Sequence, residues 1–103
     1  MKVYNKLIRD KVPASLAAQG KNFKTHIATD EEYIEKLREK LLEEVNEFLE
    51  EPCLEEAADV VEVFTALLEA LEFTQEDMIE VIEKKSEVSG DFANRIILET
   101  VEE

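Results

Sequence analysis

The sequence predicts an all-α protein: a helical hairpin or bundle of three main helices plus a short N-terminal helix, assembling with a second subunit. The 103 residues include only two Gly and two Pro, which is scarce for a β protein rich in turns. Leu, Glu, Lys, Ala and Val dominate, as is typical of packed helices. Three long segments also carry apolar residues at helical spacing. The length fits one domain over residues 1–103.

The N-terminal part of the chain predicts a short helix followed by an extended segment. Pro13 is suited to the first turn of a helix that continues through residues 14–19, and Gly20 ends it. Residues 21–28 alternate loosely in polarity and are too short for a helix. We expect them to form a small strand or an extended arm.

The first main helix has clear signals at both ends. Thr29 and Glu32 form a T-x-x-E capping box at its start. Its end falls near Glu50 or Glu51, because Pro52 disfavours helical geometry in the preceding residue. The apolar stripe between these ends consists of Ile34, Leu37, Leu41, Val45 and Phe48.

Two more helices are predicted after Pro52, over residues 53–71 and 75–88. The first is apolar over about half its circumference, more than three helices of one chain readily cover, so we expect a homo-oligomer, a dimer or a tetramer. Thr74 caps the next helix and Gly90 stops it. The residues of that helix that we expect to face inward are Met78, Ile79, Val81 and Ile82.

Charge and cysteine content exclude several classes of partner. The net charge is −14, yet residues 1–29 carry six Lys or Arg against one Asp. So acidic a chain should repel nucleic-acid polymers and anionic membranes, while its basic N-terminal part can still bind a small anion. A single cysteine, Cys53, excludes an internal disulfide and fits a reducing cytoplasm. No apolar run approaches the ~18 residues that span a bilayer.

Four acidic residues surround Pro52 in two pairs at helical spacing, Glu44/Glu47 and Glu56/Asp59. Side chains three residues apart lie on one face of a helix. If the chain reverses at Pro52, the two pairs come level to within about one residue, or about 1.5 Å of helix rise. Four carboxylates this close stay ionised only if a cation joins them. The spacing therefore predicts a metal site.

The helical wheel separates this quartet from the many other acids. Glu56 lies within the apolar arc of its helix and Glu44 at the edge of its helix's stripe, whereas Glu43 and Glu55 lie on solvated faces. Glu47 lies farthest from an apolar face. Oxygen-only ligands favour Mg²⁺, with Mn²⁺ or Ca²⁺ as alternatives. Such a site suits hydrolysis of a phosphate or pyrophosphate bond; the competing interpretation is a solvated acidic face.

The residues that carry these carboxylates resemble a known superfamily. The run Glu43–Glu47 followed by residues 56–60 is similar to the E-E-x-x-E and E-x-x-D motifs of all-α NTP pyrophosphatases, which include MazG-like enzymes and phosphoribosyl-ATP pyrophosphohydrolases. The opening YNKLIRDKVP, residues 4–13, resembles the start of a small single-domain branch. So does the C-terminal segment from Lys84 through Gly90 to Arg95.

The resemblance implies a helical oligomer with Mg²⁺ that cleaves a nucleotide between its α and β phosphates. The products would be a monophosphate and pyrophosphate. The implied metal ligands, one of which would also orient the attacking water, are Glu44, Glu47, Glu56 and Asp59. The implied phosphate contacts are Arg9, Lys11, Lys84 and Arg95.

Four points leave alternatives open. Only eight residues separate Glu47 from Glu56, and Ser89 to Phe92 reads Ser-Gly-Asp-Phe where the branch tends to read Arg-Gly-Gly-Phe. The basic pair Arg9 and Lys11 can instead form a surface patch that pairs with the acidic helices. The chain as a whole can be a non-catalytic acidic helical module that binds a partner.

Overall fold

The computed structural model describes residues 2–102. Over this range the chain forms four α-helices and no strands, which confirms the all-α prediction. It divides into two compact units, one ending at Glu72 and the other beginning at Phe73. The single-domain prediction and assembly with a second subunit remain predictions. The helices are α1 (Val12–Ala18), α2 (Asp30–Glu50), α3 (Leu54–Ala70) and α4 (Gln75–Ser89).

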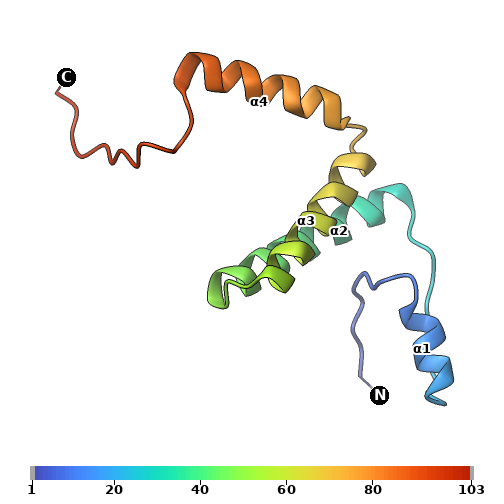
Figure 1. Ribbon diagram of the computed structural model, residues 1–103. Helices are drawn as coiled ribbons and strands as arrows, with labels where there is room; N and C mark the ends of the chain where they lie inside the picture. The colour runs from blue at the N-terminus through green and yellow to red at the C-terminus, as the bar shows by residue number, and fades with distance from the viewer. Residues whose placement is uncertain (1, 103) are drawn as a thin grey trace. The chain divides into compact units, whose positions relative to one another are not determined.

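The first unit is built on a hairpin of two long helices, α2 and α3, which pack along each other (Figure 1). The helices are joined by Glu51, Pro52 and Cys53 alone, so they run antiparallel. Glu51 has φ −136° and ψ 81°, outside the helical region, as expected for a residue before proline. The predicted end of α2 and the chain reversal at Pro52 are therefore confirmed.

The start of α2 follows the predicted cap in part. The Thr29 hydroxyl accepts a hydrogen bond from the backbone N–H of Glu32 at 3.2 Å. The reciprocal contact of a capping box is replaced, since the Glu32 carboxylate instead accepts a hydrogen bond from His26 Nε2 at 2.9 Å. Three acidic residues in the first turn of α2 complement the positive end of its helix dipole.

The core of the hairpin is small. Leu37 of α2 packs with Val63 and Leu67 of α3, and these three are the buried apolar residues of the described chain. The predicted stripe of α2 faces this core, with Ile34 and Leu41 partly buried against it. The other partly buried residues that pack against the core are Leu7, Ala66 and Ala70.

The N-terminal segment is held against the hairpin by Leu7, whose neighbours Lys6 and Arg9 both reach acids on it. The short helix α1 begins at Val12, one residue before the predicted Pro13, and Gly20 follows its end with φ 71°. Residues 21–29 form neither helix nor strand. Of the two forms expected for residues 21–28, the arm is therefore the one observed.

The second unit contains α4, whose ends match the predicted signals. The Thr74 hydroxyl accepts a hydrogen bond from the backbone of Asp77 at 3.1 Å, and Gly90 ends the helix with φ 78°. No residue of α4 is buried. The expectation that its apolar residues face a core is therefore not met within this unit, which offers no second helix to cover them. None of the helices formed by residues 2–102 has the length and apolarity needed to cross a bilayer.

Candidate metal centre

The hairpin brings three of the four predicted carboxylates together. Glu44 lies in the last two turns of α2, and Glu56 and Asp59 lie in the first two turns of α3. One carboxylate oxygen from each of the three lies within 4.8 Å of the other two. Residues 12 and 15 positions apart in the sequence thus meet because the chain reverses at Pro52, as the spacing about that proline predicted.

Burial distinguishes this group from ordinary surface acids. Glu44 is 7% exposed, and among the described residues it is the one charged residue that is buried. Its Oε1 lies 3.5 Å from Lys40 Nζ, and its Oε2 has no hydrogen-bond partner. The Oε2 of Glu56 is also buried without a partner. Buried oxygens that lack a donor are costly, so the folded chain carries two acceptors whose hydrogen-bonding capacity is unmet.

The electrostatics agree with this geometry. Burial raises the pKa of Glu44, and the negative charges of Glu47 and Asp59 raise it further, against the opposing effect of Lys40. Loss of hydration likewise raises the pKa of Glu56, reinforced by Asp59 and Glu44. Both carboxylates thus hold a proton more readily than usual, because loss of hydration and the neighbouring negative charges disfavour their ionised forms.

Glu47 differs from the other three. It is exposed, and it lies outside the group of three oxygens, although its charge is close enough to raise the pKa of Glu44. Its greater exposure agrees with its position on the wheel, farthest from the apolar stripe of α2. Its role as a ligand or as a group that orients water remains a prediction.

The donor set suits a hard divalent cation. All three residues offer carboxylate oxygens, which Mg²⁺, Mn²⁺ and Ca²⁺ prefer, and neither a histidine nor the lone Cys53 belongs to the group. Mg²⁺ commonly binds through a few carboxylates and completes its shell with water and substrate phosphate. The two partnerless oxygens therefore fit a metal site physically.

Arg9 reaches this group from the N-terminal segment. Its Nη2 donates a hydrogen bond to Asp59 Oδ1 at 2.8 Å, and its Nη1 donates one to Glu62 Oε2 at 3.0 Å. Of the two interpretations of Arg9, pairing with the acidic helices is the one that the structure shows. The guanidinium and a metal ion would share the Asp59 carboxylate.

The other predicted phosphate contacts are Lys11, Lys84 and Arg95. Lys11 is exposed and precedes α1 as its N-cap residue. Lys84 pairs with Glu80 on α4 at 3.0 Å, and Arg95 follows that helix with φ 60°. Lys84 and Arg95 belong to the second unit, so their role stays a prediction. Asp91, one of the departures from the family pattern, accepts a hydrogen bond from the backbone of Ala93 in a local turn.

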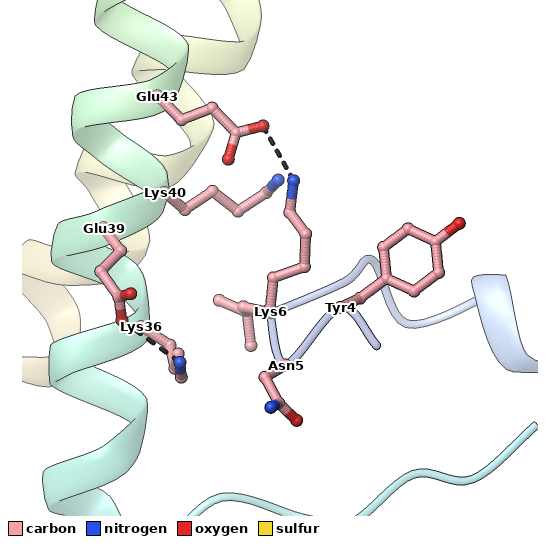
Figure 2. Close-up of a pocket in the computed structure, with 8 residues that line it drawn as sticks. Tyr4, Asn5, Lys6, Lys36, Glu39, Lys40 and Glu43 are labelled. Atoms are coloured by element: carbon pink, nitrogen blue, oxygen red, sulfur yellow. Dashed lines mark hydrogen bonds and ion pairs between the residues drawn. The ribbon is translucent and has the colours of Figure 1, made fainter. Parts of the chain in front are cut away.

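Three lysines that the sequence did not single out share a cavity, and one of them, Lys40, lies 3.5 Å from Glu44. Lys6, Lys36 and Lys40 line a cavity between the N-terminal segment and α2 (Figure 2). The sequence held a signal for two of them, because Lys36, Lys40 and Glu44 recur every four residues and so share one helix face. Lys6 lies within the N-terminal segment that carries the family resemblance.

Comparison with known proteins gives no independent assignment. No protein-family model matches the sequence, and no curated protein or solved structure matches it significantly. The resemblance to the all-α NTP pyrophosphatases therefore stays a prediction from the sequence.

Proposed function

We propose that this chain is a Mg²⁺-dependent nucleotide pyrophosphohydrolase of the all-α NTP pyrophosphatase type. One observation carries the proposal: three carboxylates from two helices converge, and two of their buried oxygens lack any hydrogen-bond partner. On a solvated acidic face, these oxygens would be exposed to water. Their burial is explained if a cation completes the site.

Glu44, Glu56 and Asp59 would hold the ion, with Glu47 at the edge of the group. When bound, Mg²⁺ would neutralise phosphate charge and make a coordinated water more acidic. Mn²⁺ would serve the same chemistry. The core around Leu37 holds the two helices of the hairpin together. It would therefore hold the carboxylates, and an ion bound to them, in a defined position.

The reaction adds one water across the bridge between the α and β phosphates. A new P–O bond forms to the water oxygen, the bridging P–O bond breaks, and pyrophosphate leaves with the bridging oxygen. The water proton must pass to a base. The exposed Glu47 carboxylate beside Glu44 is suited to accept a hydrogen bond from this water and orient it.

The contacts of Arg9 favour one alternative. Because the guanidinium already binds Asp59 and Glu62, the acidic hairpin can be compensated from within the chain. In that case the protein is a non-catalytic helical module that binds a partner. The two functions differ in whether the carboxylates turn over a substrate.

Pyrophosphate release from a panel of nucleotides, with and without Mg²⁺, tests the enzyme proposal. We expect Mg²⁺-dependent release that Asp59→Asn lowers by about 100-fold or more, since a metal ligand is lost. Glu55→Gln is the matched control, because it removes an exposed acid from the first turn of α3, one turn before Asp59, and should retain activity. Absence of turnover across the panel, or equal rates in both variants, would favour the binding module.

A further inference from the structure

A second site adjoins the carboxylates. The N-terminal segment and α2 border a cavity of about 230 Å³ that is open to solvent, lined on one side by Tyr4, Asn5 and Lys6 and on the other by Lys36 and Lys40 (Figure 2). Asn5 has φ 46°, a left-handed conformation that Asn tolerates better than most residues. This bend lies between Tyr4 and Lys6, both of which line the cavity.

The cavity is locally cationic in a chain of strongly negative charge. Three ammonium groups line it against two carboxylates, those of Glu39 and Glu43, while the whole chain carries −14. Lys6 Nζ lies 2.9 Å from Glu43 Oε1, and Lys36 Nζ lies 3.4 Å from Glu39 Oε2. Each ammonium has three donors and such a contact uses one, so donors remain for an anion.

The cavity and the carboxylate group are electrostatically linked. Lys40 lines the cavity and also lies 3.5 Å from Glu44. The pKa of Lys6 is raised chiefly by its hydrogen bond to Glu43, and the charges of Glu47 and Glu44 contribute to the same shift. An anion held by these lysines would therefore lie beside an ion held by Glu44.

We propose that this cavity is the anion subsite for the phosphate chain of the substrate, with Lys6, Lys36 and Lys40 as its donors. This assignment rests on the proposed function, and the contacts that the family resemblance implies stay predictions. The volume lies below the roughly 300–1,000 Å³ typical of pockets for whole drug-sized ligands. It suits a phosphate or pyrophosphate group and leaves the nucleoside outside. On binding, phosphate oxygens would replace Glu43 as the partner of Lys6 and Glu39 as the partner of Lys36.

Titration of the full chain with inorganic pyrophosphate by calorimetry, with and without Mg²⁺, tests the subsite. Lys6→Gln and Lys36→Gln are the informative variants, because neither lysine pairs with a carboxylate of the candidate metal group. Each should weaken pyrophosphate binding by about tenfold, since a charge-assisted hydrogen bond is lost. Lys24→Gln, which removes an exposed lysine that does not line the cavity, should bind like the unchanged chain.

A charge-conserving variant guards against a loss of folding. Lys6→Arg should retain most of the affinity, and circular dichroism should show the same helix content in every variant. Equal pyrophosphate affinity in Lys6→Gln, Lys36→Gln and Lys24→Gln would overturn the subsite. So would an unchanged chain that binds no pyrophosphate at millimolar concentration in the presence of Mg²⁺.

The two proposals fail in different ways. If nucleotides are cleaved but KM is the same in Lys6→Gln and Lys36→Gln as in the unchanged chain, the enzyme stands and the subsite is wrong. If pyrophosphate binding depends on these lysines but no nucleotide is cleaved, the anion site stands and the pyrophosphohydrolase proposal is wrong.

Discussion

Replacing Glu44 with Gln removes one negative charge from the carboxylate group and keeps the size of the side chain. At an effective dielectric constant of about 20, charges 4.8 Å apart repel by about 3.5 kcal/mol, and an ammonium 3.5 Å away attracts by about 4.7 kcal/mol. Repulsion by Glu56 and by Asp59, set against attraction by Lys40, leaves a net repulsion of about 2 kcal/mol at Glu44. Partial exposure of its two acidic neighbours lowers this figure.

We therefore expect metal-free Glu44→Gln to be more stable than the unchanged chain by about 1–2 kcal/mol. For a domain of this size, 1 kcal/mol corresponds to a shift of about 4–8 °C in Tm. With Mg²⁺ we expect the unchanged chain to be the more stable of the two. A ligand at 100 times its Kd stabilises the folded chain by about 2.7 kcal/mol, a gain that the variant should largely lose.

Thermal melts in EDTA and at increasing Mg²⁺ measure both effects. Glu55→Gln is the control for charge alone, because Glu55 is exposed and lies outside the group. Its Tm should change little in EDTA, and its response to Mg²⁺ should match that of the unchanged chain. If Glu44→Gln melts at or below the unchanged chain in EDTA, and Mg²⁺ shifts neither protein, the carboxylates are neither mutually repelling nor a metal site.

Two further predictions concern pH and the core. Because the pKa values of Glu44 and Glu56 are raised above 4.5, the folded metal-free chain binds protons more readily than the unfolded chain, and its stability should fall as pH rises through these values. Urea melts from pH 4.5 to 8 in EDTA measure this, and a flat profile would contradict it. Leu37→Ala should lower the free energy of unfolding by about 2–5 kcal/mol, since Leu37 is 2% exposed. Leu49→Ala, at a position that is 67% exposed, should stay within about 0.5 kcal/mol, and equal losses would refute the assigned core.

Helix ends were predictable because they depend on chemistry within a few residues. Thr29, Pro52, Thr74 and Gly90 act through their own backbone geometry or through donors three residues away, and each begins or ends a helix as expected. The convergence of Glu44 with Asp59 followed from the same local rules. Once both helices and a tight connection are given, the pairing across the hairpin is nearly determined.

The contacts of the N-terminal segment could not be predicted in the same way. Lys6 meets Glu43 and Arg9 meets Asp59 across 37 and 50 residues. Both contacts depend on Leu7 docking against the core of the hairpin. Since 25 acids follow residue 29, the sequence offers many equivalent partners for each basic residue. Only the packing of an apolar side chain selects among them, and charge pattern alone does not encode it.

The N-terminal segment also decides how the two proposed sites depend on each other. It brings Lys6 to the cavity and Arg9 to Asp59, so one docked segment supplies cations to both an anion subsite and the carboxylates. A metal ion at Glu44 would attract an anion held by Lys40, and the anion would in turn attract the metal. Such coupling is reciprocal, so Mg²⁺ and pyrophosphate must strengthen each other's binding by the same factor. An acidic hairpin compensated only by Arg9 has no reason to show this reciprocity.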